Sequence, residues 1–335
     1  MIAGIGQPTA RLLYKGVNIW DSISSEVISL TFTDNLDGQA DDIDLELKND
    51  HQKWFDAWFP ETGDQLLGFL GYKGGKLLDM GTFFLDEPHA SGSRGGDIFR
   101  IKGQSKPVDQ ALKTKKTAAF EKQSQKQIAR KVLSAAGLTM IGEPPEVSFE
   151  RVTQRREFDL EFLARMASDY GAFFAIKGKN AVYAKRDDLF AQEPVRSLTK
   201  GSRDIVTYEL RHTTDKTHTK AKASYFDGNA KKSIDVEVED SDVKTGDVLR
   251  TDDRTESKGH ARKLAASKLQ KANMKVWTGS FELLGDPSCQ AGQIVTLSGF
   301  GRWDRKYIIK SARHRFARSG YTTNVELEDA RPSAA

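Results

Sequence analysis

The chain carries a similar β-module near each end, and this internal repeat limits its possible folds more than any single residue does. The first copy begins at residues 65–72 and the second at 293–300, and each continues into a β-rich stretch. The later landmarks of the two copies are His89 and Gly95 in the first, and His314 and Gly320 in the second. Short hairpins with glycine turns also resemble one another by chance, and this alternative stays open. Two like modules per chain would give a trimer six quasi-equivalent units in a ring.

With 335 residues, the chain is longer than one ordinary compact core, so two or three domains are expected. We predict an α+β, mainly β protein, in which two similar antiparallel β-barrel modules flank a smaller domain. The expected boundaries are 1–105 for the first module, 106–192 for an α+β middle domain, 193–330 for the second module with an inserted helix, and 331–335 for a frayed tail.

Alternation of apolar and polar residues predicts the strands. Ile43, Leu45 and Leu47 alternate with acidic residues, as in an antiparallel strand with one buried and one wet face. In the middle segment, Ser124 and Gln127 have the spacing of a capping box. They predict a helix that ends at Gly137, and a second helix is expected at about 159–170. A further helix is expected at about 259–274, within the second β-rich part.

Composition excludes several classes of protein. No stretch is apolar enough to cross a bilayer, so no membrane is expected as a partner, and the N-terminus lacks the features of a secretory signal. A single cysteine, Cys289, cannot form a disulfide within the chain, which suits synthesis in a reducing cytosol. The net charge of +4 is small, although lysines crowd two segments. Charge runs of this kind are usually solvated helix faces. The crowded residues are Lys113, Lys115, Lys116, Lys122, Lys126, Arg130 and Lys131, then Lys258, Arg262, Lys263, Lys268, Lys271 and Lys275.

No catalytic, cofactor-binding or metal-binding residue is predicted, so we do not expect an enzyme. The histidines form no metal-ligand spacing, and His212 and His218 bracket a turn without a third ligand. The chain also lacks a nucleophile elbow, a phosphate-binding loop and a dinucleotide fingerprint. Cys289 precedes a strand without a neighbouring histidine in sequence, which favours a small packed residue. This pattern indicates an assembly protein.

Two further segments resemble a known family. The first is the helix pattern at 156–166 followed by Tyr170, Gly171 and an aromatic strand; the second runs from 263–269 through 278–281 and 291–295 to 307–314. Both are similar to the phage late control gene D family of contractile-tail baseplate hub proteins, which is related to the N-terminal hub part of the type VI secretion spike protein VgrG. The resemblance covers about 41–327.

The resemblance implies a homotrimer whose two β-barrels alternate in a pseudo-sixfold ring, with the middle domain outside it. Such a hub continues a hexameric tail tube on one side and holds a trimeric spike on the other, beside other baseplate proteins. It would be assembled in the bacterial cytoplasm and reside in a virion or a phage-tail-like particle. Because the chain lacks the needle of spike-fused relatives, we expect the spike to be a separate protein.

The lumen of such a ring would pass DNA without gripping it if its lining were polar or acidic. Candidate lining residues are Asp42, Asp44, Glu46 and the acidic run near Asp235, although ordinary solvent-facing strand residues explain them equally well. Two other functions are weighed: a nucleic-acid-binding regulator, suggested by the lysine-rich helices, and a peptidoglycan-cleaving tail enzyme. No helix-turn-helix pattern or aromatic-rich basic patch supports specific nucleic-acid binding.

Overall fold

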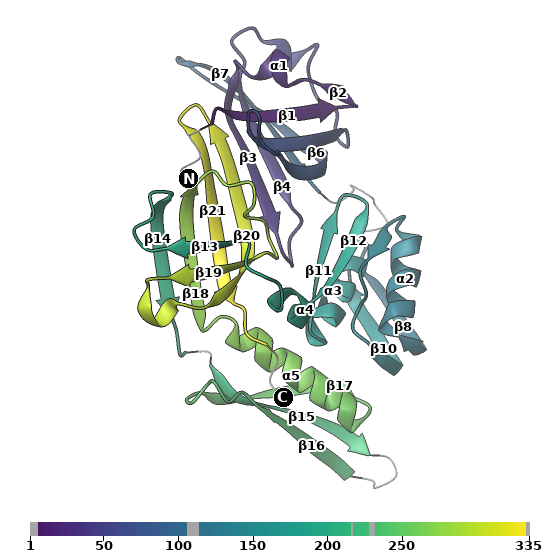
Figure 1. Ribbon diagram of the computed structural model, residues 1–335. Coiled ribbons are helices and arrows are strands. Elements are labelled where there is room, and N and C mark those ends of the chain that lie inside the picture. The colour runs from purple at the N-terminus through teal and green to yellow at the C-terminus, as the bar shows by residue number, and fades with distance from the viewer. Residues whose placement is uncertain (1–5, 106–113, 216, 228–231, 333–335) are drawn as a thin grey trace.

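The computed structural model describes residues 6–105, 114–215, 217–227 and 232–332. Figure 1 shows a β-rich body formed by both ends of the chain, an α+β unit beside it, and a helix over a small sheet at the end opposite the first module.

One 13-stranded sheet unites the first and last parts of the chain. From the first part it takes β1 (Pro8–Tyr14), β2 (Val17–Asn18), β3 (Val27–Asn35), β4 (Asp42–Lys48), β5 (Gln65–Tyr72), β6 (Leu78–Ser93) and β7 (Gly96–Gln104). From the last part it takes β13 (Arg196–Thr199), β14 (Ile205–His212), β18 (Trp277–Leu284), β19 (Ile294–Ser298), β20 (Lys306–Ala317) and β21 (Gly320–Asp329). Short helices α1 (Trp20–Ile23), η1 (Lys53–Phe55) and η3 (Gly301–Trp303) lie between these strands.

The two halves of this sheet share one strand order, which confirms the internal repeat. Neighbours run β3-β4-β7-β6-β5-β1 in the first half and β14-β18-β21-β20-β19-β13 in the second. The details agree as well, because β3 and β14 each carry a bulge near their start, at Val27/Ser29 against β4 and at Ile205/Thr207 against β18. Bulges are specific local features, so their recurrence at one position argues against chance resemblance.

The sequence alignment of the repeat is corrected by the pairing. The hairpins close at Ser93–Gly96 and at Ala317–Gly320. Counting back from these turns places Ala90, not His89, level with His314. It also places Phe83 level with Tyr307, so that Leu66 corresponds to Val295. Local sequence similarity cannot detect a shift of one residue in the alignment of the two copies. Such a shift nevertheless exchanges the two faces of a strand.

Neither half is a closed barrel by strand pairing. Among the described residues, β1 pairs only with β2 and β5, and β13 pairs only with β19. The β13·β19 pair is also parallel rather than antiparallel. Instead, β3 leaves the first half to pair with β20 over Ser29–Asn35. The expected pair of separate barrels is therefore two open, curved sheets joined edge to edge.

Alternation along the strands builds a separate core for each half. On β4, Ile43, Leu45 and Leu47 are buried while the acidic residues between them face outward. One buried cluster packs strands of the first half and also includes Tyr321 from β21, whereas a second packs around Phe281 and Tyr307. The hydrophobic effect thus stabilises each half separately, and Tyr321 ties the two together.

The α+β unit lies between the halves in sequence and has its own core. Ser124 and Gln127 form the predicted capping box. The pairing of β8 with β10 was not predicted, because Phe120 is the only buried residue of β8 and such a strand shows little periodicity. The unit consists of β8 (Lys116–Ser124), α2 (Gln125–Ala135), β9 (Thr139–Ile141), β10 (Ser148–Glu157), α3 (Asp159–Asp169), β11 (Ala172–Lys177), β12 (Asn180–Lys185) and α4 (Arg186–Phe190).

The insertion in the second half is larger than the single helix expected. It comprises β15 (His218–Asp227), β16 (Lys232–Glu239), β17 (Asp247–Thr255) and α5 (Lys258–Asn273). The three strands form a separate sheet whose Ala223 and Val236 pack on Ala265 and Leu269 of the helix. The polar sequence of β17 hides this strand from pattern analysis.

The prediction of a frayed tail at 331–335 is wrong for Arg331. Arg331 is buried and forms ion pairs with Asp329 and Asp240, 2.8 and 3.2 Å away. Residues 333–335 lie outside the described part. Across the described chain, no helix has both the length and the apolar character needed to traverse a bilayer.

Candidate assembly surface

The outward face of the joined sheet carries acids and bases in alternation. Asp44 accepts from the Arg100 guanidinium, with Nε 2.7 Å from Oδ1, and Glu46 accepts from Ser29 Oγ at 3.2 Å. Asp42 accepts from Thr33 Oγ1 at 3.3 Å, and burial raises the pKa of Asp42 while nearby Arg313 opposes that rise. We call this face the polar face. The three predicted lining acids lie together on it, but basic residues stand among them, so the face is mixed rather than acidic.

The second acidic run is partly neutralised by ion pairs. Glu237 on β16 bridges Lys220 and Lys222, each 2.8 Å away. Asp235 accepts from Ser224 Oγ at 2.7 Å. This run belongs to the insertion and not to the 13-stranded sheet, so the structure separates it from the polar face.

Several of the crowded lysines have partners within the chain, and Lys113 lies outside the described residues. Lys126 is 2.6 Å from Glu143, and Lys116 pairs with Asp159. On α5, Lys268 pairs with Asp253, and Lys263 donates to the Glu146 carbonyl at 3.0 Å. Such pairing leaves less positive potential to attract phosphate groups.

A polar joint holds the α+β unit against both halves of the sheet. The Lys177 ammonium lies 2.6 Å from both Asp34 and Asp41, and Asp34 also accepts from the Ala291 backbone at 2.8 Å. Burial raises the pKa of Asp41 to about 6, and the Asp34 charge adds to that rise while Lys177 opposes it. Burial lowers the pKa of Lys177, but the two carboxylates outweigh it and raise the pKa overall. Lys177 thus connects the α+β unit to the first part of the chain, and Asp34 extends this connection to Ala291 in the last part.

A buried arginine connects α4 to α5. Arg186 is 1% exposed, and its guanidinium donates to the carbonyls of Ser267 and Ser168 at 2.9 and 2.6 Å. Burial lowers the pKa of Arg186 to about 10. The planar fork reaches two backbone acceptors at once, which a lysine cannot do in the same way.

Beneath the second half of the sheet, His314 is held in one neutral tautomer. Its Nε2 donates to the Cys289 carbonyl at 3.0 Å, while Nδ1 accepts from the hydroxyls of Tyr321 and Thr323 at 2.7 and 3.1 Å. Burial lowers the pKa of His314 to about 4. The Cys289 side chain is buried too, and burial raises its thiol pKa to about 12. Both groups are therefore packed and chemically quiet, as predicted for Cys289.

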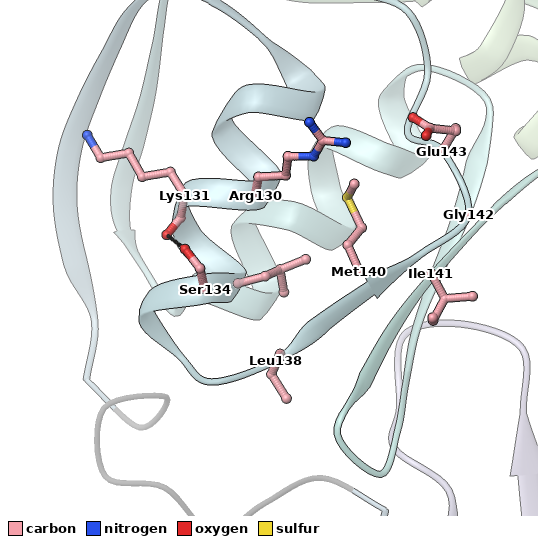
Figure 2. Close-up of a pocket in the computed structure, with 9 residues that line it drawn as sticks. Arg130, Lys131, Ser134, Leu138, Met140, Ile141, Gly142 and Glu143 are labelled. Atoms are coloured by element: carbon pink, nitrogen blue, oxygen red, sulfur yellow. Dashed lines mark hydrogen bonds between the residues drawn. The ribbon is translucent and has the colours of Figure 1, made fainter.

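A hollow of about 680 Å³ lies on the α+β unit. Arg130 and Lys131 of α2 and Met140 and Ile141 of β9 are among its lining residues, which Figure 2 shows. Ser134 Oγ donates to the Lys131 carbonyl at 3.2 Å. Its lining residues bring together no nucleophile and base, so the hollow offers a shape for contact rather than chemistry.

The part of the chain that the structure describes contains no group of three or more His, Cys, Asp or Glu placed to hold a metal. His212 packs on Trp277, with ring centroids 4.0 Å apart. The backbone N–H of His218 donates to Asn273 Oδ1 at 3.0 Å. The two histidines thus serve different local contacts.

Comparison with known proteins agrees with this picture of an assembly protein. The chain is 25% identical over 367 residues to a probable baseplate hub protein of Escherichia phage 186, covering 96% of this chain and 92% of that protein. Its fold matches the 43 kDa tail protein of prophage MuSo2 from Shewanella oneidensis, with a TM-score of 0.74 at 17% identity over 97% of this chain and 99% of the other.

A chain of the Francisella PdpA-VgrG complex shares the fold more distantly, with a TM-score of 0.55 at 9% identity over 98% of this chain and 59% of that one. The family model for phage tail baseplate hub (GPD) proteins matches residues 100–320. This match covers both the α+β unit and most of the second half of the sheet, and on it the chain belongs to the phage tail baseplate hub family.

Proposed function

We propose that this hub protein is a homotrimer that adapts a sixfold tail tube to a trimeric central spike. The observation that carries the proposal is the shared strand order of the two halves, down to the bulges in β3 and β14. Three such chains supply six quasi-equivalent units while keeping true threefold symmetry, so one ring suits partners of both symmetries. The role is structural, with the spike supplied as a separate protein.

The buried clusters support domain boundaries near residues 105 and 192. One cluster draws only on the α+β unit, and another draws on the first part of the chain together with Tyr321. In the assembled particle, the α+β unit stands outside the ring and the polar face lines the lumen. Interleaved acids and bases on this face give DNA phosphates no uniform positive surface to bind.

The test is the absolute mass of the purified protein by light scattering, alone and with the tail tube and spike proteins of the same particle. A trimer alone, or a complex holding three hub chains and three spike chains, is the expected result. A protein that stays monomeric at high concentration and in the presence of both partners would overturn the proposal.

The regulator and the wall-cleaving enzyme find less support. The paired lysines described above weaken the case for nucleic-acid binding. Cell-wall cleavage is tested by the turbidity of a cell-wall suspension incubated with the protein. A fall in turbidity that a single Asp or Glu substitution abolishes would establish an enzyme in place of a purely structural hub.

A further inference from the structure

Besides the outer edges of β1, β2 and β13, two further strand edges of the 13-stranded sheet have no partner among the described residues. The first is the outer edge of β14, the last strand in the sheet order, whose residues are nearly all exposed. Val206 and Tyr208 on it are 52% and 45% exposed. The second is the edge of β6 beyond Phe84, where the β5 ladder has ended and only β7 pairs with the strand. Exposed edges of this kind pair readily with another chain.

The chain itself contains the template for joining such edges. β20 pairs with β19 over Lys306–Ile308, and β3 then takes the same edge over Ser311–Ala317. By the repeat, β20 corresponds to β6 and β3 corresponds to β14. The unpaired half of β6 is therefore equivalent to the edge of β20 with which β3 pairs. The unpaired strand β14 is equivalent to β3 itself. Figure 1 shows the occupied pair, β3 beside β20.

We infer that β14 of one protomer pairs antiparallel with the free half of β6 in a second copy, which specifies how the proposed trimer closes. The inference rests on the proposed function. Transferring the β3·β20 register through the repeat pairs Ser93 with Thr207, Gly92 with Tyr208, Ser91 with Glu209, Ala90 with Leu210, and His89 with Arg211. The contact is head-to-tail, so each copy gives one edge and accepts another.

The side-chain faces agree with this register. Tyr208 and Leu210 lie on the inner face with Phe281, and Ala90 shares the inner face with its partner Phe99. Glu209 and Ser91 lie on the polar face. A slip by one residue would oppose inner and outer side chains, so it is excluded. Tyr208 would also cover Gly92, an arrangement that stabilises glycine in strands.

Local backbone features limit the pairing to this segment. Glu87 has a φ of 48° and forms a bulge with Pro88. Proline has no N–H to donate to a ladder, so the new pairing ends at His89. The exposed Phe55 and Phe59 lie on Phe99, next to the edge. They supply apolar surface that a neighbouring copy would cover.

A disulfide across the proposed pair tests the inference. In a Cys289→Ala background, the double variant Ser91→Cys, Glu209→Cys places thiols on directly paired residues, whose Cα separation of about 4.5–5.5 Å suits a disulfide. Mild oxidation should give reduction-sensitive covalent dimers and trimers on a denaturing gel. Hydrogen exchange should also slow at 205–212 and 89–93 in the oligomer.

Two matched variants control the experiment. Thr31→Cys with Arg315→Cys occupies the equivalent pair inside one chain and should cross-link without a change of mass. Ser91→Cys with Tyr208→Cys has thiols on opposite faces and should stay uncross-linked.

Light scattering on the same samples separates the outcomes. If the protein is trimeric and the internal control closes while Ser91→Cys, Glu209→Cys does not, the pairing is overturned and the hub proposal stands. If the protein is monomeric alone and with both partners, the proposed function fails, and the inferred contact fails with it.

Discussion

At the scale of single residues, His314 shows how this protein accommodates a buried polar side chain in its core. His314 has partners for both ring nitrogens, and the equivalent position in the first half of the sheet is Ala90. The histidine thus belongs to the joint between the halves, where it stacks on Phe32 with centroids 5.9 Å apart. Burial disfavours the charged imidazolium form, which explains why the pKa of His314 is low.

His314 predicts a dependence of stability on pH. Its pKa falls from 6.5 in the unfolded chain to about 4 in the fold, so the unfolded state binds more protons between these values. The free energy of unfolding should therefore decrease as the pH falls from 6.5 to 4, by as much as about 3 kcal/mol. Guanidinium unfolding of His314→Gln should show a weaker decrease, since glutamine retains a donor and an acceptor without titrating. His89→Gln, at an exposed position, is the control and should follow the wild type.

Arg186 predicts a cost for a substitution that keeps the charge. Arg186→Lys should reduce the free energy of unfolding by about 2–3 kcal/mol, because the Ser267 and Ser168 carbonyls cannot both be reached by a compact ammonium. The exposed Arg262→Lys on the neighbouring α5 should change it by less than about 0.5 kcal/mol. Equal effects in the two variants, measured by urea unfolding, would contradict this role for Arg186.

At the scale of elements, β3 is the strand on which the architecture depends. It pairs with β4 inside the first half and with β20 of the second. Its burial on both sides contrasts with the exposure of β14, which has the same place in the repeat but one neighbour. Identical local structure thus has different surroundings at the two positions.

Phe32 of β3 contacts Phe83 of the first half and His314 of the second. Phe32→Ala should cost about 3–5 kcal/mol and should accelerate hydrogen exchange in both β4 and β21, since it loosens both halves. Leu70→Ala, fully buried in the first half, should cost about 2–5 kcal/mol but accelerate exchange in the first half alone. The same exchange pattern in both variants would argue against β3 as the coupling strand.

At the scale of the whole molecule, charge is balanced locally as well as in total. The net charge is +4, and three lysines of the crowded segments pair with carboxylates, at Asp159, Glu143 and Asp253. A polar face that carries charges of both signs gives DNA phosphates no uniform positive surface to bind.

This balance predicts weak and salt-sensitive binding to DNA. Fluorescence anisotropy with a labelled duplex should detect association only at low salt, and it should vanish near physiological ionic strength. Lys126→Glu should weaken this binding further, because the variant replaces the Lys126–Glu143 pair, which has no net charge, by two negative charges. Tight binding to one duplex sequence that survives physiological salt would favour the regulator instead.

Much of the local structure follows from sequence patterns, and the long-range register does not. The capping box at Ser124, the helix at 159–170 and the alternation along β4 were each predicted, because neighbouring residues carry these signals. The polar strand β17, the burial of Arg331 and the match of His314 with Ala90 were not. Each of these depends on a partner far away in sequence, such as Asp240 for Arg331.

The amino-acid sequence alone predicted many of the elements, because periodicity, caps and turn residues act over a few positions, and it also indicated the repeated module and the resemblance to the hub family. Only the tertiary structure decided that β3 crosses to β20, that Lys177 gathers Asp34 and Asp41, and that β14 and half of β6 remain open. The physical reason is that strand edges are alike in their hydrogen-bonding groups, so which edges meet depends on the packing of the cores beneath them.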